Sequence, residues 1–249
     1  MHLYQKILSE QKRNEKSIAI VIDPDKTDRR KLLHEVKRIS HSNIRYIFVG
    51  GSLLSDDFSV SIINALKDHT DIPVISFPGN AMQINTAADA ILYLSLLSGR
   101  NPEYLIGQHV VSAPKLYASG IEVISTGYLL IDGGVMSSTA YVSNTTPIPS
   151  NKPDIAACTA IAAEFLGMKM LYLEAGSGAL FPVSQKMIQK VREVTSIPII
   201  TGGGIKTPED IRNAASAGAD IMVLGSVLEE NFSSLPYLAG ALEEASLRV

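Results

Sequence analysis

Tryptophan is absent from the 249-residue sequence, and the tyrosines and phenylalanines are scattered without the spacing of a stacking surface. The formal net charge of −3 gives the chain no general attraction for nucleic acid or for an anionic membrane. We therefore expect no nucleic-acid partner. An anionic substrate would have to be held by local groups such as loop amides, helix N-termini or a metal ion.

Long apolar runs and cysteines are also scarce. No stretch approaches the roughly 18 apolar residues of a membrane span, and charged residues interrupt residues 1–16 before a signal peptide's apolar run could form. The one cysteine, Cys158, cannot form an internal disulfide, which fits a reducing cytoplasm. Its neighbours, residues 156–163, read as an apolar helix, so we expect the thiol to be buried. These absences predict a cytoplasmic protein without a membrane span.

Short β-branched runs alternate with longer amphipathic segments along the chain. The expected strands are residues 18–23, 44–49, 73–77, 89–94, 122–131, 169–174, 197–201 and 220–224, and the expected helices are residues 28–39, 56–68, 102–118, 153–166, 184–195, 208–217 and 236–247. Near-continuous hydrophobic strands are typical of parallel sheets covered on both faces. With a length near the ~250 residues of one barrel, the pattern favours a single (β/α)8 TIM barrel over residues 1–249 rather than an open doubly wound sheet.

Two units depart from this alternation. The segment 78–88 is too short for a helix and two loops, so we expect the third helix to be modified or missing. Residues 132–151 read as one loop of roughly twenty residues on the expected catalytic side, a length typical of functional covers. We interpret this segment as a mobile cover. A static surface loop or a subunit contact is the alternative.

Catalytic groups of such barrels lie at the C-terminal ends of the strands and in the loops that follow. Five motifs occupy those positions: IDPDK at 22–26, VGGS at 49–52, YLEAGSGA at 172–179, TGGGIKTPED at 201–210 and LGSVLEEN at 224–231. The five histidines lie in predicted helices or at their ends, outside all of these motifs. We therefore expect no catalytic histidine, no Ser-His-Asp arrangement and no zinc site.

The last two motifs predict a phosphate site. Glycines 202–204 let backbone amides approach an anion without a Cβ in the way. Thr207 and Pro208 form a helix start, with Thr207 as the N-cap. Gly225 and Ser226 supply a second small-residue turn one strand later, and paired loops after strands 7 and 8 are the usual phosphate site of these barrels. The alternative is that these glycines only make tight turns.

A carboxylate adjoins this site at the end of the sixth strand. Glu174 can accept a hydrogen bond from a substrate hydroxyl and help to remove its proton, and Tyr172 points to the same side because side chains alternate along a strand. Ser177 and the amides of Gly176 and Gly178 could close over a phosphate. The alternative for Glu174 is a structural carboxylate that caps a helix or forms a salt bridge.

The first two motifs predict a metal site. Asp23 and Asp25 form a carboxylate pair held by Pro24, and Ser52 at the neighbouring strand end could add a hydroxyl. Mg²⁺ favours one or two carboxylates with substrate phosphate oxygens and water. The alternative is that the aspartates cap the following helix.

In this order and at these strand ends, the five motifs resemble those of the geranylgeranylglyceryl phosphate synthase family, including its heptaprenylglyceryl phosphate synthase branch. The resemblance covers nearly the whole chain, although GGGI alone is shared with many barrels. It implies an Mg²⁺-dependent prenyltransferase in lipid biosynthesis, on a barrel with a modified third helix. Such an enzyme joins the C3 hydroxyl of sn-glycerol 1-phosphate to a prenyl diphosphate and releases pyrophosphate. Geranylgeranyl diphosphate is the expected donor, with heptaprenyl diphosphate as the alternative.

The resemblance also implies roles for individual residues. Asp23 and Ser52 would bind Mg²⁺, and the implied reaction is consistent with Glu174 as the catalytic residue that deprotonates the attacking hydroxyl. The glycerol phosphate would be bound by Tyr172, Leu173, Glu174, Ala175, Gly176, Ser177, Gly178, Gly203, Gly204, Gly225 and Ser226. Several relatives have a lysine where this chain has Val21, so an additional cationic contact is not expected here.

A prenyl donor also needs an apolar channel, which we expect at the ends of strands 3 and 4 and along the helix 102–118. We expect a homo-oligomer as well. Two rival functions are another phosphate-handling barrel, such as an isomerase or an aldolase-like lyase, and a ligand-binding barrel without catalysis.

Overall fold

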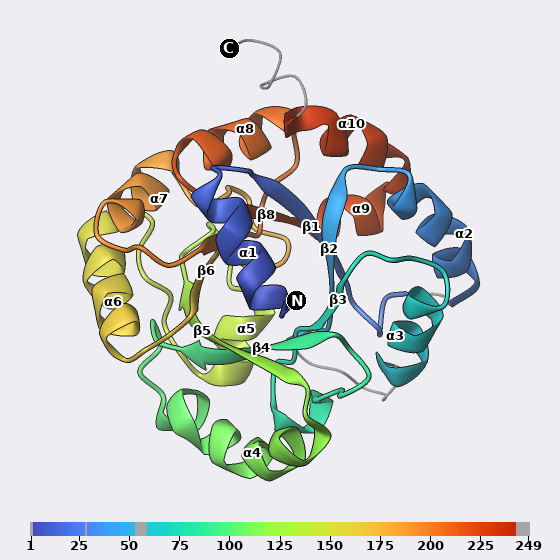
Figure 1. The fold of residues 1–249 in the computed structure, drawn as a ribbon. Helices are drawn as coiled ribbons and strands as arrows, with labels where there is room; N and C mark the ends of the chain where they lie inside the picture. The colour runs from blue at the N-terminus through green and yellow to red at the C-terminus, as the bar shows by residue number, and fades with distance from the viewer. Residues whose placement is uncertain (1, 28, 53–58, 243–249) are drawn as a thin grey trace.

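The computed structural model describes residues 2–27, 29–52 and 59–242, which form a closed barrel of eight parallel strands (Figure 1). The strands are β1 (Ser17–Ile22), β2 (Ile44–Val49), β3 (Val74–Ser76), β4 (Ala90–Leu96), β5 (Glu122–Leu130), β6 (Met170–Glu174), β7 (Ile199–Gly202) and β8 (Ile221–Leu224). Each strand pairs with the next, and β8 pairs with β1. The predicted barrel is confirmed, with strand ends shifted by a few residues.

Helices surround the strands in the order expected from the sequence (Figure 1). They are α2 (Arg29–Ser40), α3 (Ser59–Lys67), the π-helical turn η2 (Glu103–Gly107) continuing into α4 (Gln108–Ser119), α6 (Pro153–Phe165), α7 (Gln185–Arg192), α8 (Pro208–Ser216), α9 (Ser226–Glu230), η3 (Phe232–Ser234), α10 (Leu235–Ala239) and η4 (Gly240–Leu242). Residues 28, 56–58 and 243–247 of the predicted helices lie outside the described residues.

Alternating side chains of the strands build two packed layers. Ile18, Ile20 and Leu171 point outward and pack in the layer between the strands and the helices. Tyr46 and Tyr172 point inward and help to fill the barrel interior. Because both faces are covered, the strands read as continuous hydrophobic runs in the sequence.

The third unit has no α-helix, as predicted. Between β3 and β4 lies one 3-10 turn, η1 (Ala81–Gln83), which begins where the Asn80 side chain accepts a hydrogen bond from the Met82 amide. The Ala81 amide donates to Gln108 Oε1 of α4 at 2.6 Å. Helix α4 is thus hydrogen-bonded to the short turn η1. An opening remains beside β3 and β4.

An N-terminal helix, α1 (Leu3–Lys12), was not predicted from the sequence. It lies across the end of the barrel where the strands begin (Figure 1). Leu3 and Ile7 pack into the barrel interior, and the Glu122 carboxylate accepts hydrogen bonds from the amides of Leu3 and Tyr4 at 2.6 and 2.9 Å. Because α1 closes this end, only the opposite end of the barrel is left for a site.

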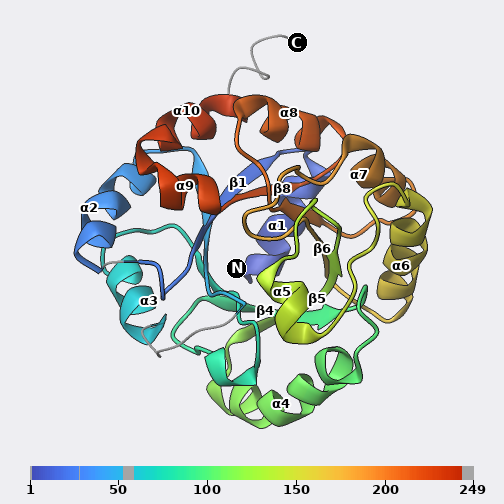
Figure 2. The ribbon, with the colours of Figure 1, turned by 180° about the vertical axis from the view of Figure 1, so that it is seen from behind.

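The segment 132–151 is not a continuous loop. It contains α5 (Ser138–Ser143), which starts at Ser137, whose hydroxyl accepts a hydrogen bond from the Ala140 amide. It also returns to the barrel through a parallel bridge between Ile131 and Ile148. Figure 2 shows α5 lying over the end of the barrel where the strands finish. The loop prediction was wrong here because a serine cap starts a short helix inside a polar sequence.

The prediction that Cys158 is buried was also wrong, since this side chain is exposed. Ala156, Ala160 and Ala163 occupy the face of α6 that packs on the barrel. At 3.6 residues per turn, Cys158 lies on the other side of the helix. In an almost uniformly apolar helix the sequence does not reveal which face is buried.

Candidate functional site

The five strand-end motifs meet in one polar cavity at the mouth of the barrel. Predicted site residues that line it are Asp23, Ser52, Tyr172, Glu174, Ser177, Gly203, Gly204, Gly225 and Ser226. Four other predicted residues, Leu173, Ala175, Gly176 and Gly178, do not line the cavity. The side chains of Leu173 and Ala175 pack in the outer layer, so that these two residues face a ligand at most through their backbone.

The loops after β7 and β8 build the end of the cavity where the phosphate site is predicted. Gly203 and Gly204 have φ values of +78° and +72°, a left-handed conformation that glycine adopts without strain. Thr207 and Asp210 then form a reciprocal capping box at the start of α8, as the Thr207 N-cap prediction requires. Apart from its chain neighbours, the nearest heavy atom of the described residues to a Cβ on Gly225 would be the Val21 Cβ, at 3.9 Å. An anion therefore has open space above this turn.

Glu174 lies on the inner face of the barrel with 7% of its surface exposed. One of its oxygens, Oε1, accepts a hydrogen bond from the Gly176 amide at 2.7 Å, and the carboxyl also hydrogen-bonds Tyr172. Burial outweighs these bonds and raises the pKa of Glu174 to about 7. No salt bridge reaches Glu174 within the described part of the chain. A carboxyl with this pKa can accept a proton near neutral pH.

Gly202 of β7 and Gly203 of the following turn also leave the space that the Glu174 carboxyl occupies. A Cβ on Gly202 would lie 2.7 Å from the Tyr172 hydroxyl and 2.9 Å from Glu174 Oε2. A Cβ on Gly203 would overlap Glu174 Oε1 and the Gly176 backbone. The triple glycine therefore does more than open space for an anion, because it also lets β7 approach the carboxyl of β6.

The predicted metal residues lie at the same mouth. Asp23 is half-buried; its Oδ1 accepts from the Asp25 amide at 3.1 Å, and its Oδ2 lies 3.6 Å from Lys26 Nζ. That ammonium is closer to Glu229, at 2.9 Å. Burial raises the pKa of Asp23 more than the amide and Lys26 lower it. Asp23 therefore shares its nearest cation, Lys26, with Glu229. A half-buried carboxylate in this arrangement fits Mg²⁺.

The protein by itself offers few ligands to a metal. No group of three or more His, Cys, Asp or Glu side chains that could hold an ion occurs among residues 2–27, 29–52 and 59–242. Asp23 and Ser52 would supply one carboxylate and one hydroxyl, and Asp25 lines the same cavity but is exposed. This set suits Mg²⁺ held together with a substrate diphosphate, since Mg²⁺ usually retains phosphate and water ligands.

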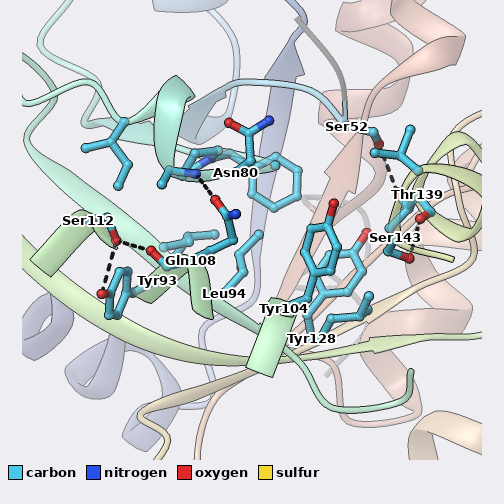
Figure 3. A pocket seen from close by; sticks show the side chains of 18 of the residues that line it. Ser52, Asn80, Tyr93, Leu94, Tyr104, Gln108, Ser112, Tyr128, Thr139 and Ser143 are labelled. Atoms are coloured by element: carbon cyan, nitrogen blue, oxygen red, sulfur yellow. Dashed lines mark hydrogen bonds between the residues drawn. The ribbon is translucent and has the colours of Figure 1, made fainter. Parts of the chain in front are cut away.

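A second, largely apolar cavity adjoins the polar one where the third helix is missing. It encloses about 810 Å³, its opening included. Its lining comes from the segment after β3, from β4 and from η2 and α4, where the apolar channel was predicted, and includes Phe77, Leu92, Leu94, Leu96 and Tyr104 (Figure 3). Both cavities are lined by Phe77, whose ring stacks on Tyr172 at 5.3 Å. The polar mouth therefore continues directly into an apolar groove.

Several lining residues were not predicted from the sequence, among them Tyr128, Thr139 and His109. Tyr128 on β5 lines both cavities; the inward alternation of the predicted strand was a signal that could have found it. Thr139 also lines both, but no signal pointed to it because α5 itself was not predicted. His109 lines the apolar cavity, with Nε2 3.2 Å from Ser95 Oγ.

The chain matches known proteins over nearly its whole length. The model of the PcrB family matches residues 10–241. A geranylgeranylglyceryl phosphate synthase of Chitinophaga pinensis is 46% identical over 98% of this chain and 97% of its own length. One of Korarchaeum cryptofilum is 41% identical over 88% and 89%.

A solved structure agrees with this likeness. The (S)-3-O-geranylgeranylglyceryl phosphate synthase of Thermoplasma acidophilum, in complex with its substrate sn-glycerol-1-phosphate, superposes with a TM-score of 0.91 at 33% identity, covering 98% of this chain and 99% of the other. Within the described residues, no helix is long and apolar enough to cross a bilayer. By its sequence, its barrel and its strand-end motifs, the chain belongs to the PcrB family, together with these geranylgeranylglyceryl phosphate synthases.

Proposed function

We propose that this protein is a prenyltransferase that joins the C3 hydroxyl of sn-glycerol 1-phosphate to a long prenyl diphosphate. One observation carries the proposal: a polar cavity with a phosphate-type turn and a near-neutral carboxyl opens directly into an apolar groove. One cavity suits two phosphorylated groups, and the other suits a hydrocarbon chain. The relatives named geranylgeranylglyceryl phosphate synthase, such as those of Chitinophaga pinensis and Korarchaeum cryptofilum, support geranylgeranyl diphosphate as the donor rather than heptaprenyl diphosphate.

The acceptor is held by the side of the cavity that β6, β7 and β8 build. Its phosphate would contact the turns at Gly203–Gly204 and Gly225–Ser226, while its C3 hydroxyl would donate to Glu174. As the C3 oxygen bonds to C1 of the donor, the bond from C1 to the diphosphate breaks, and Glu174 takes the hydroxyl proton. Pyrophosphate leaves toward Asp23 and Ser52 on the other side of the mouth.

Mg²⁺ fits beside Asp23 and Ser52, and when bound it would offset the negative charge that develops on the departing pyrophosphate. The protein's own part there is to keep the Asp23 carboxylate half-buried and close to the donor. Lys26 supplies the cation among the described lining residues of the polar cavity. Val21 also lines this cavity and lies nearest to Gly225, so a lysine at position 21 would start close to the phosphate turn.

The proposal extends to the assembly and its surroundings. We propose a homo-oligomer in the cytoplasm, which is supported by the exposed apolar side chains Val110, Val111 and Tyr117 on α4 and by the single cysteine. Light scattering coupled to size exclusion tests the first part, since a mass of one chain would contradict it.

The function is tested by incubating the protein with labelled sn-glycerol 1-phosphate, geranylgeranyl diphosphate and Mg²⁺, followed by extraction into organic solvent. Label in the organic phase, together with released pyrophosphate, is the expected result. Reactions with sn-glycerol 3-phosphate and with EDTA are the matched controls. Label that stays in water under all conditions would contradict prenyl transfer.

Two substitutions at the phosphate turns are expected to weaken glycerol phosphate binding about tenfold or more, while prenyl diphosphate binding changes little. In Gly203→Val the side chain blocks the amides and collides with Glu174, and in Ser226→Asp a carboxylate repels the phosphate. Calorimetry with each substrate measures both affinities. Ser216→Asp, exposed at the end of α8, is the control for added charge. Unchanged glycerol phosphate affinity in both variants would reject this site.

Residues 132–151 are expected to exchange amide hydrogens more slowly when both substrates are bound. α5 lies over the mouth, and Ser138 and Thr139 line the polar cavity, so ligands beneath them should restrict their motion. Hydrogen exchange with mass spectrometry tests this, with α6 as the internal reference. Equal exchange of this segment with and without substrates would leave it a static structural segment.

A further inference from the structure

The polar and apolar cavities share five lining residues: Gly51, Ser52, Phe77, Tyr128 and Thr139. We call this group the seam. In the proposed function, on which this inference rests, the donor crosses the seam, with its diphosphate on one side and its hydrocarbon on the other. The bond that breaks therefore lies close to these residues.

Three of the seam residues, Ser52, Tyr128 and Thr139, carry hydroxyl groups, and Figure 3 shows a hydrogen bond between those of Ser52 and Thr139. Thr139 Oγ1 lies 2.8 Å from Ser52 Oγ, within hydrogen-bond distance, and Tyr128 belongs to the same group of lining residues. Burial holds the pKa of Tyr128 well above its usual value, so its hydroxyl keeps its proton. Of the two hydroxyl protons of Ser52 and Thr139, one is shared between these residues, and the other is left to be donated to a third group.

The position of Thr139 on α5 is fixed by contacts at both ends of this helix. The N-terminal end of α5 is anchored by Ser137, which is buried and packs so closely on the β6 loop that a Cβ on Gly176 would lie 2.6 Å from its Cβ. At the other end, Asn101 Nδ2 donates to the Ser143 carbonyl at 2.7 Å. Thr139 therefore has a defined position from which to orient Ser52.

We propose that Thr139 is a positioning residue for the prenyl donor and acts through Ser52. In one of the two possible directions of their hydrogen bond, the Thr139 hydroxyl donates to Ser52. Ser52 Oγ then accepts from Thr139 with one lone pair, keeps its second lone pair for a cation and donates its proton to a diphosphate oxygen. Without the Thr139 hydroxyl, Ser52 loses the hydrogen bond that orients it, and the diphosphate loses an oriented partner.

The test compares Thr139→Val, which keeps the shape without the hydroxyl, with Thr139→Ser, which restores the hydroxyl. Calorimetry with inorganic pyrophosphate and Mg²⁺ is expected to show about tenfold weaker binding in the valine variant and binding within about twofold of the parent in the serine variant. The kcat/KM for the donor should fall in parallel, with an unchanged KM for sn-glycerol 1-phosphate. Thr159→Val is the matched control, because Thr159 Oγ1 bonds only to its own helix at Ile155 among the contacts of the described residues.

A double substitution separates this role from general damage. If Thr139 acts through Ser52, Ser52→Ala with Thr139→Val binds pyrophosphate no worse than Ser52→Ala alone. Additive losses, or an unchanged pyrophosphate affinity in Thr139→Val, would overturn the proposal. Should the valine variant fail to fold, Thr139→Ala removes the same hydroxyl in its place. If the parent binds pyrophosphate but forms no lipid product, the proposed function is refuted, while the pyrophosphate affinities of the Thr139 variants can still be compared. If the parent does not bind pyrophosphate at all, both proposals are refuted.

Discussion

Replacing Asp23 by asparagine is expected to lower turnover by about a thousandfold or more while leaving the fold intact. The amide keeps the size of the side chain but removes the charge that would hold Mg²⁺ against the diphosphate. Because burial already raises the pKa of Asp23, the neutral amide should cost the free protein no stability. Steady-state kinetics at saturating Mg²⁺, together with thermal melting of the free protein, measures both effects.

Asp25→Asn is the matched control in the same turn, since Asp25 is exposed whereas Asp23 is half-buried. Its turnover should stay within about threefold of the parent, as for most surface substitutions. If Asp23→Asn keeps Mg²⁺-dependent activity near the parent rate, the assignment of Asp23 to the metal fails. A loss that is equal in both variants would point to the net charge of the turn instead.

Replacing Glu174 by glutamine is expected to lower kcat/KM by about 10²- to 10⁴-fold, the usual contribution of a positioned general base. The amide can still hydrogen-bond Tyr172 and the acceptor hydroxyl, but it cannot take the proton. Glu209→Gln, exposed in the first turn of α8, is the control for losing a carboxylate elsewhere. Near-parent activity of Glu174→Gln would show that another group removes the proton.

The pH dependence of the parent protein gives an independent reading of the same residue. With the pKa of Glu174 raised to about 7, kcat/KM should rise with pH and level off above that value, because only the ionised form acts as a base. The stability of the folded protein should change with pH in the opposite direction. Between the ordinary carboxyl pKa and about 7, the folded protein keeps a proton that the unfolded chain has lost, so the free energy of unfolding falls as pH rises. Glu174→Gln should remove both trends.

The features predicted correctly from the sequence are those whose place in the structure follows from their place along a strand. All strands of a parallel barrel finish at the same end, so motifs far apart in sequence, such as those holding Asp23, Glu174 and Ser226, had to meet there. The short segment 78–88 between two predicted strands also identified the missing third helix. The alternation of Tyr172 and Glu174 on one face followed from the strand period alone.

Features that depend on tertiary contacts were not predictable in this way. α1 is charged and short, and its role at the barrel end depends on contacts with Tyr46 and Glu122 that lie far off in sequence. α5 is held over the mouth by Asn101 and by packing against Gly176 rather than by its own helical pattern. Because Thr139 reaches the site only through α5, its place at the seam became visible only in the structure.

The mass of the lipid product, measured across a series of prenyl diphosphates from about ten to thirty-five carbons with sn-glycerol 1-phosphate, tests the central claim most directly. We expect a product whose mass equals the sum of the two substrates less pyrophosphate, formed fastest with the geranylgeranyl donor. A maximum with heptaprenyl diphosphate would keep the reaction and change the donor. No condensed product with any donor, in a protein that still binds sn-glycerol 1-phosphate, would contradict the account.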